Sequence, residues 1–240
     1  MEKTDRLWPG GIRFLFDDTL FQPSTDSFLL GSFPTLRRGM QVCDLGAGTG
    51  LLGLLLLARE PSLRITNVEL QAPALALAQR SAALNGFQAQ ITCVAGDLRD
   101  KTLLPAGAFD LLISNPPYFD AGRGFVAPEE NRGAARADLT CALPELCAAA
   151  GRLTRYGGSF CLIFRAERMA ELFAALQANH MEPKRLRMVQ NTAQSAPKLF
   201  LLEAKKGGRP GLSVLPPLLL RDADGQETPE LRRIYFRDKE

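Results

Sequence analysis

A glycine-rich loop after a short apolar segment constrains the fold of this chain most strongly. Residues 41–45 (Gln-Val-Cys-Asp-Leu) are expected to form a strand, residues 46–50 (Gly-Ala-Gly-Thr-Gly) a loop, and the apolar residues 51–58 a helix. Glycines let the backbone pass close to a ligand, and the N-terminus of a helix turns its amide groups toward it. A strand, a glycine loop and a helix in this order indicate a nucleotide-type cofactor loop in an α/β domain.

The spacing of the glycines separates two kinds of cofactor loop. The dinucleotide fingerprint G-x-G-x-x-G would require glycine at position 51, where the chain has leucine. An acid, Asp44, stands two residues before the first glycine, where it would repel a pyrophosphate and suits a ligand with a cationic amine. No Gly-Lys-Ser/Thr follows, which excludes a Walker loop. The candidate cofactor-binding residues of this segment are Asp44, Gly46, Gly48 and Gly50.

Two further expected strands lead to acids. Residues 64–69 end at Glu69, about twenty residues beyond the loop, where a carboxylate can accept both hydroxyls of a ribose. Residues 90–94 are followed by Asp97 and Leu98, where a carboxylate can accept a hydrogen bond from an adenine amino group. The alternatives are an exposed strand-end charge for Glu69 and a turn cap for Asp97.

The fourth expected strand, residues 109–114, runs into Asn115-Pro116-Pro117-Tyr118. Proline lacks a backbone donor and fixes φ, so strand pairing has to stop there. The motif can be a plain strand stop, but open α/β sheets bind ligands just beyond the carboxyl ends of their strands.

Residues 119–137 are rich in Gly, Ala and charged residues without periodicity, which predicts a mobile substrate-recognition loop. The candidate substrate contacts are Pro117, Tyr118, Phe119, Arg123, Arg132 and Arg136.

The segments outside the cofactor loop and the proline motif complete an α/β domain. Residues 12–16 are expected to form a short edge hairpin or an arm, and Ser24-Thr25-Asp26 to cap a helix over residues 27–33. A turn is expected at residues 156–158, followed by a strand at 159–164. An antiparallel pair of strands is expected at 185–190 and 199–204, and a small terminal hairpin within 215–225. Further helices are expected over residues 73–84, 143–152, 167–178 and 229–236.

These segments predict a mostly parallel seven-stranded sheet with an antiparallel late hairpin and helices on both faces. We divide the chain into an N-terminal arm and capping segment (residues 1–34), a cofactor-binding domain (35–206) and a basic C-terminal extension (207–240) packed on the same domain.

Composition bounds the class of protein. Hydrophobic residues make up 46% of the chain and charged residues 23%, which is ordinary globular composition. Without a signal core or an apolar run of about 20 residues, we expect a soluble, intracellular protein with no membrane partner.

The five cysteines include no CxxC spacing, which argues against disulfides and zinc, and the single histidine, His180, is expected to end a helix. Residues 184–240 carry twelve Lys/Arg against seven Asp/Glu, which permits a polyanionic partner but also suits a solvated surface.

The motifs together fit one ligand, S-adenosylmethionine, and here the sequence resembles the class I, Rossmann-like methyltransferases. Asn115-Pro116-Pro117-Tyr118 resembles the motif of their amino-methylating branch, which includes adenine-N6 and glutamine-N5 enzymes. The amine nitrogen of such substrates is a poor nucleophile because its lone pair is delocalised. The Asn115 side-chain oxygen and the Pro116 carbonyl can each accept one N–H, which frees the lone pair for in-line attack, and Tyr118 can stack on the substrate. No metal is required, and S-adenosylhomocysteine would be the product.

A narrower resemblance, to the bacterial tRNA(Val) adenine-37 N6-methyltransferases, covers nearly the whole chain. It is carried by residues 14–17, 26–31, 44–50, 114–119, 203–208 and 215–218. The resemblance implies that Gln22 and Asp26 lie near the cofactor and that the substrate is an adenine beside the anticodon of tRNA-Val. It implies a cytoplasmic enzyme, which we expect to be a monomer or a weak homodimer.

Three alternatives remain at this point. One is a release-factor-type glutamine-N5 methyltransferase, although the Gly-Gly-Asp-Gly-type segment usual after the motif in those enzymes is missing here. Another is an rRNA amino-methyltransferase. The third is a non-enzymatic adaptor with the same fold, against which the presence of Asn115, Asp44 and Glu69 argues.

Overall fold

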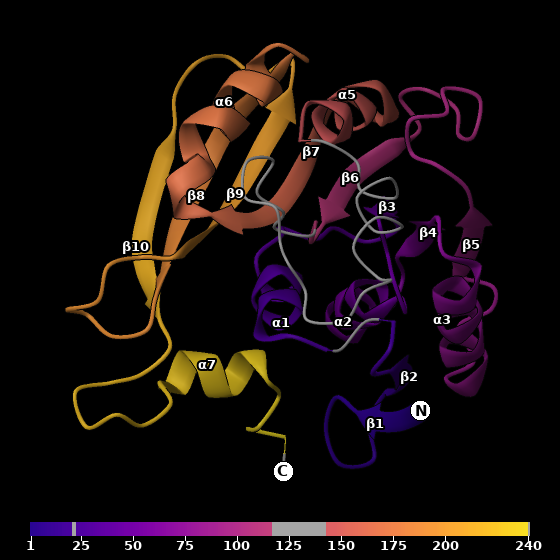
Figure 1. Cartoon of the computed structure of the whole chain (residues 1–240), viewed down its shortest axis with the longest axis horizontal. Coiled ribbons are helices and arrows are strands. Elements are labelled where there is room, and N and C mark those ends of the chain that lie inside the picture. The colour runs from indigo at the N-terminus through magenta and orange to yellow at the C-terminus, as the bar shows by residue number, and fades with distance from the viewer. Residues whose placement is uncertain (21–22, 117–142, 240) are drawn as a thin grey trace, which may run out of the picture.

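A central sheet of eight strands organises the molecule (Figure 1). The computed structural model describes residues 1–20, 23–116 and 143–239. The strand order in the sheet is β10-β8-β9-β7-β6-β3-β4-β5. The bounds are β3 Gln41–Leu45, β4 Arg64–Glu69, β5 Ile91–Ala95, β6 Phe109–Ser114, β7 Thr154–Arg165, β8 Met181–Gln190, β9 Leu199–Lys206 and β10 Ser213–Leu219.

The pairing of the strands confirms the mostly parallel sheet with a late antiparallel hairpin. Strands β4 and β6 both pair parallel with β3, β5 continues beyond β4, and β7 continues beyond β6. Strand β9 pairs antiparallel with both β7 and β8. The chain thus places β4 and β5 on one side of β3 and then continues with β6 and β7 on the other side. The change of direction creates a topological switch point between β3 and β6. Open α/β sheets bind their ligands at such a point.

The predicted terminal hairpin within residues 215–225 and the count of seven strands are wrong. Residues Ser213–Leu219 form β10, an eighth strand parallel to β8 at the edge of the sheet. An edge strand tolerates proline because only one of its sides is paired, and the ladder shifts register between Leu215 and Leu218, around the two prolines. The turn does exist one step later, where an isolated antiparallel bridge joins Arg221 to Glu227.

The predicted turn at residues 156–158 is an irregularity inside β7. Phe109 of β6 pairs with Thr154, but Leu111 pairs with Ser159, so β7 carries extra residues between these two pairs. Gly157 has φ 76°, a left-handed conformation that glycine adopts without steric cost. The strand therefore begins before the glycines and bulges through them.

Of the two expected forms of the N-terminal segment, an edge hairpin or an arm, the structure has a hairpin, but it does not join the edge of the central sheet. Strands β1 (Glu2–Arg6) and β2 (Arg13–Asp17) pair antiparallel as a separate two-stranded sheet. The hairpin is attached to α3 (Ala72–Leu84), because the Leu15 amide donates to the buried Ser81 hydroxyl at 2.9 Å.

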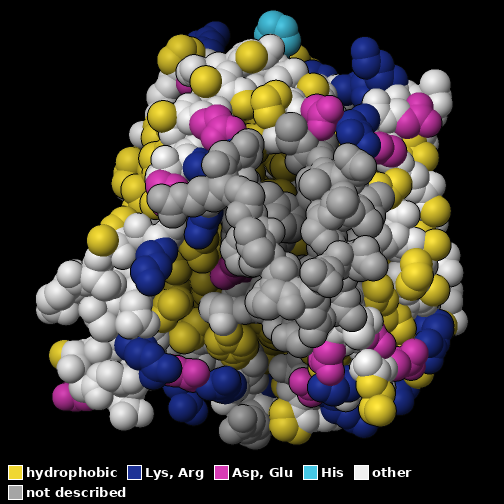
Figure 2. All heavy atoms as spheres, viewed as in Figure 1, with side chains coloured by type: hydrophobic (Ala, Val, Ile, Leu, Met, Phe, Trp, Pro, Cys, Tyr) yellow, Lys and Arg dark blue, Asp and Glu magenta, His cyan; other side chains and the backbone are white. Residues whose placement is uncertain are grey.

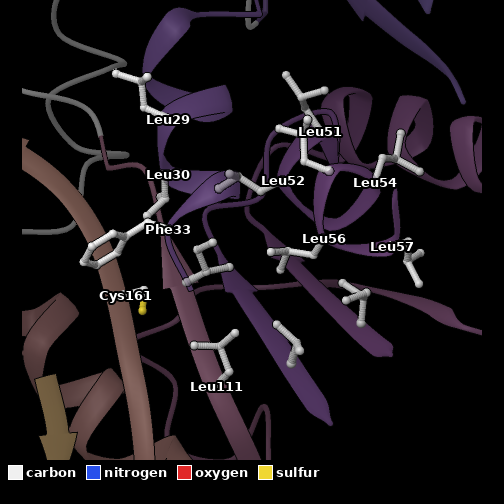
Figure 3. Packing of buried hydrophobic residues seen from close by; sticks show 14 of the residues in the cluster. Leu29, Leu30, Phe33, Leu51, Leu52, Leu54, Leu56, Leu57, Leu111 and Cys161 are labelled. Atoms are coloured by element: carbon white, nitrogen blue, oxygen red, sulfur yellow. The ribbon is translucent and has the colours of Figure 1, made fainter. Parts of the chain in front are cut away.

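Helices cover both faces of the central sheet, as predicted. Successive strand residues enter opposite layers: Val42 packs in one hydrophobic cluster and Cys43 in the other. Helices α1 (Thr25–Ser32) and α2 (Leu51–Arg59) fill the first layer, where Figure 3 shows their leucines above Leu111 and Cys161. Helices α5 (Leu143–Leu153) and α6 (Met169–Gln177) fill the second, and α7 (Pro229–Ile234) packs near the C-terminus.

The first cluster draws on all three predicted segments, since it includes Leu7, Leu56 and Leu231. Cys43, Cys147 and Cys161 are buried core residues and Cys93 is half-buried, whereas Cys141 lies outside the described residues. His180 follows α6 with φ 58°, and its amide donates to the Gln177 carbonyl, so it does lie where the helix ends. Within the described ranges, no helix is long and apolar enough to cross a membrane.

Candidate functional site

The carboxyl ends of four parallel strands bring the predicted residues to one edge of the sheet. Asp44 on β3 pairs with Ile113 on β6, two residues before Asn115. Glu69, the last residue of β4, pairs with Ala95, the last residue of β5, and Asp97 follows two residues later. Asp44 and Asn115 therefore flank the switch point between β3 and β6, and Glu69 and Asp97 lie farther along the same edge of the sheet.

The glycine loop is held against the neighbouring strand and helix. The Gly46 and Ala47 amides both donate to the Val68 carbonyl, at 2.9 and 3.0 Å. Gly46, Gly48 and Gly50 all have positive φ, between 54° and 77°. At Gly50 there is also no room for a side chain, because a Cβ would lie 2.8 Å from the Ala78 Cβ on α3. Tight packing at Gly50 fixes the base of the loop.

Glu69 holds the glycine loop by a hydrogen bond. Its Oε2 accepts from the Gly48 amide and its Oε1 from the Gln71 amide, both at 2.8 Å. The side chain is buried, which contradicts the alternative of an exposed strand-end charge. A carboxylate offers about four acceptor positions, so the remaining lone pairs can accept two ribose hydroxyls.

Asp44 is a buried acid without a counterion in the described part of the chain. It is 0% exposed, and neither carboxylate oxygen accepts a hydrogen bond from a described residue. Burial, together with the negative charge of Glu69, raises the pKa of Asp44 to about 8. An orphaned buried carboxylate is costly unless a ligand pairs with it. Asp44 therefore fits the ammonium group of an amino-acid moiety, which is the cation that S-adenosylmethionine carries beside its sulfonium.

Asp97 caps a turn and pairs with a residue that the sequence argument missed. Its Oδ1 accepts from the Arg99 amide at 2.8 Å, and the Arg99 guanidinium bonds to both carboxylate oxygens. The Arg99 contacts lower the pKa of Asp97 below its usual value. The turn cap, one of the two alternatives, is thus what the structure has, and a contact from Asp97 to an adenine stays a prediction. Leu98 is half-buried beside the second hydrophobic cluster.

Asn115 is oriented by a residue from the N-terminal segment. Its Nδ2 donates to the Ser27 Oγ on α1 at 3.2 Å, and Ser27 is buried. Just before it, the Ser114 hydroxyl donates to the Leu45 carbonyl at 2.7 Å, which ties the end of β6 to β3. Pro116 is half-buried after Asn115. The contacts of Ser27 and Ser114 were not predicted, because nothing in a lone serine signals them.

The other candidates divide into one placed residue and seven outside the described ranges. Asp26 lies in the first turn of α1, beside Ser27 in sequence, while the N-cap position is Ser24, whose side chain makes no capping hydrogen bond. Gln22, Pro117, Tyr118, Phe119, Arg123, Arg132 and Arg136 lie outside the described residues, so their roles stay predictions.

A basic groove lies on the other side of α1. It encloses about 440 Å³ between α1, α7 and strands β8 to β10, and it is lined by Arg185, Arg187, Arg233 and Glu230 over aromatic rings that include Phe28, Phe33 and Phe236. Figure 2 shows hydrophobic side chains in a recess left of centre, with Lys and Arg side chains along its margin. Phe28 adjoins Ser27 in α1, so the groove and the Asn115 site share this helix.

Three comparisons place this architecture among known proteins. The family described as methyltransferase small domain matches residues 23–171. A tRNA1(Val) (adenine(37)-N6)-methyltransferase from Porphyromonas gingivalis is 30% identical over 237 residues, covering 92% of this chain and 91% of the relative. A protein of the same name from Cronobacter sakazakii is 31% identical, covering 89% of this chain and 86% of the relative.

A solved structure has the same fold. A predicted O-methyltransferase from Agrobacterium tumefaciens has a TM-score of 0.73 at 24% identity, over 88% of this chain and 95% of its own. This likeness confirms the predicted Rossmann-like methyltransferase fold. On the sequence matches, the chain belongs to the methyltransferase small domain family and, within it, to the tRNA1(Val) (adenine(37)-N6)-methyltransferases.

Proposed function

We propose that this protein transfers a methyl group from S-adenosylmethionine to the exocyclic N6 amine of an adenine in tRNA, at position 37 of tRNA-Val. The observation that carries the proposal is the placement of Asn115, two residues beyond the register partner of Asp44, across the β3–β6 switch point from the buried Asp44 carboxylate, which accepts no hydrogen bond from a described residue. Asn115 provides an acceptor for the substrate amine, and Asp44 provides a partner for a cationic cofactor. The names of the relatives favour adenine in tRNA over glutamine in a release factor.

The cofactor would lie across the strand ends. Asp44 would pair with its ammonium group, Glu69 would accept from its ribose hydroxyls, and the segment Asp97–Leu98 would border its adenine. Gln22 and Asp26 are assigned to its neighbourhood by the family resemblance alone. When bound, S-adenosylmethionine supplies an electrophilic methyl group on a sulfonium.

The chain's own contribution is to orient the substrate amine. The Asn115 amide oxygen and the Pro116 carbonyl accept the two N6 hydrogens, which favours a tetrahedral nitrogen with its lone pair directed at the methyl group. A nitrogen–carbon bond forms as the sulfur–carbon bond breaks, and the amine afterwards loses one proton to water. Tyr118 stacks on the adenine and Pro117 stiffens the platform. Phe119, Arg123, Arg132 and Arg136 are proposed to contact the RNA beside it.

The basic groove supports a polyanionic partner. The guanidinium of Arg187 pairs with Glu230 at 2.7 Å, whereas Arg233 is exposed on α7 at the margin of the groove. Cationic grooves with aromatic floors suit single-stranded RNA, because phosphates meet the cations and bases stack on the rings. We assign the groove to nucleotides that flank the target, in a cytoplasmic enzyme that acts as a monomer or weak homodimer.

A methyl-transfer assay tests the proposal. The protein is incubated with S-adenosylmethionine labelled in the methyl group and one of three acceptors: unmodified tRNA-Val transcript, the same transcript with guanine at position 37, or a release factor. Digestion should give labelled N6-methyladenosine from the first transcript only. Label in the release factor, or equal label in both transcripts, would contradict the proposed substrate.

A further inference from the structure

The amide of Asn115 has two possible orientations, and only one is useful for the proposed reaction. A rotation of 180° exchanges its oxygen and nitrogen, which differ in hydrogen-bonding character. An amine substrate needs the oxygen, because the Nδ2 group can only donate. Here Nδ2 donates to Ser27 Oγ at 3.2 Å, which places the amide oxygen on the side away from Ser27.

We propose that Ser27 is a positioning residue that holds Asn115 in its amine-accepting orientation. The inference rests on the proposed function. Ser27 is only 2% exposed, so water cannot readily replace it as the partner of Nδ2. Loss of its hydroxyl would remove this acceptor for Nδ2 and so weaken the preference for the present amide orientation, and the amine would then meet a donor in part of the molecules.

Helix α1 is fixed firmly enough for this role. Leu29 and Leu30 are fully buried in the first hydrophobic cluster. Gly31 packs against α2 so closely that a Cβ would lie 2.9 Å from the Leu55 Cβ. At the end of the helix, the Arg59 guanidinium donates to the Gly31 and Pro34 carbonyls at 2.6 and 2.8 Å. Packing along the rest of the helix therefore sets the position of Ser27.

The first turn of α1 is also braced from the C-terminal extension. The Tyr235 hydroxyl donates to the Thr25 Oγ1 at 2.8 Å. The Tyr235 ring also contacts the Phe28 ring, with centroids 4.8 Å apart. Thr25 and Phe28 lie on either side of Ser27 in sequence, so the C-terminal extension supports the turn that holds Asn115.

The test is the variant Ser27→Ala, compared with Ser62→Ala. The Ser62 hydroxyl bonds to Glu60, in the loop that precedes β4 at the opposite edge of the sheet. With rates normalised to the fraction of protein that binds S-adenosylhomocysteine, Ser27→Ala should lower kcat about 10- to 100-fold. Its KM for tRNA and its affinity for S-adenosylhomocysteine should stay within about threefold. Ser62→Ala should behave as the wild type, and an unchanged kcat in Ser27→Ala would overturn the proposal.

A substrate-free measurement separates this proposal from the proposed function. The side-chain amide signals of Asn115 in ¹⁵N-labelled protein are assigned by their absence in Asn115→Asp. These signals should shift in Ser27→Ala and not in Ser62→Ala; unshifted signals in Ser27→Ala would overturn the Ser27 role. If the wild type methylates no tRNA, the proposed function fails while the amide signals still decide the contact. Should Ser27→Ala not fold, Ser27→Cys replaces the hydroxyl by a weaker acceptor of similar size and should give an intermediate kcat.

Discussion

At the scale of single residues, the site depends on an acid that is protonated more readily than usual. Burial and the nearby Glu69 raise the pKa of Asp44 to about 8. Only the ionised carboxylate attracts an ammonium group, so below this pKa a proton competes with the cofactor. The affinity for the cofactor should therefore rise as the pH rises toward 8.

Calorimetric titration of S-adenosylhomocysteine at several pH values measures this dependence. Between pH 6 and pH 8, the Kd of the wild type should fall by up to about tenfold per pH unit. Asp44→Asn removes both the charge and the titration, so its binding should be about 10- to 150-fold weaker at pH 8 and nearly independent of pH. An equal pH slope in wild type and variant would show that another group is responsible.

At the scale of elements, the glycine loop is held by packing as much as by backbone conformation. Gly50 combines φ 77° with a Cβ position 2.8 Å from Ala78 and 2.9 Å from the Asn67 Nδ2. Gly107 also has positive φ, 64°, but a Cβ there would approach no neighbour closer than 3.9 Å. An alanine at Gly107 would therefore introduce backbone strain alone, whereas an alanine at Gly50 would introduce backbone strain and steric overlap.

Urea unfolding of two alanine variants compares these effects. Gly107→Ala should lower the free energy of unfolding by about 1 kcal/mol, the cost of a left-handed alanine. Gly50→Ala should lower it by about 2–4 kcal/mol, because overlap with α3 adds to the same strain, and it should also weaken cofactor binding. Equal losses in the two variants would mean that the loop and α3 can move apart without cost.

The sequence predicted strand ends far better than contacts between distant segments. Asp44, Glu69 and Asn115 each stand at or just beyond the end of an expected strand, and parallel strands necessarily bring such ends to one edge. The contact between Ser27 and Asn115 joins residues 88 positions apart, and no local pattern encodes it. Strand β10 was missed because Pro216 and Pro217 resemble a turn, and only the edge position of the strand makes them acceptable.

At the scale of the whole molecule, the N-terminal and C-terminal segments meet around α1. Trp8 lies against Phe236, with ring centroids 5.1 Å apart, and Tyr235 contacts Phe28. These contacts place α7 beside both the basic groove and the helix that holds Asn115. The proposed RNA contact of α7 and the proposed orientation of Asn115 by α1 thus involve neighbouring parts of one packed structure.

A charge reversal on α7 tests the groove. Arg233→Glu should weaken tRNA binding roughly tenfold at moderate salt and lower the salt slope by about 1, because a phosphate contact is lost. The affinity for S-adenosylhomocysteine should not change. Arg64→Glu, an exposed arginine at the start of β4, is the matched control and should leave tRNA binding as it is. A similar loss in both variants would indicate only a long-range effect of net charge.

The proposed mechanism depends most on Asn115 as the residue that accepts hydrogen bonds from the substrate amine. Single-turnover methyl transfer to tRNA-Val and equilibrium binding of S-adenosylhomocysteine, measured on wild type and Asn115→Ala, test this directly. We predict that the variant loses at least about 1,000-fold in the rate of transfer, near 4 kcal/mol of transition-state stabilisation, while cofactor affinity stays within about threefold. Transfer at the wild-type rate by Asn115→Ala would contradict the mechanism.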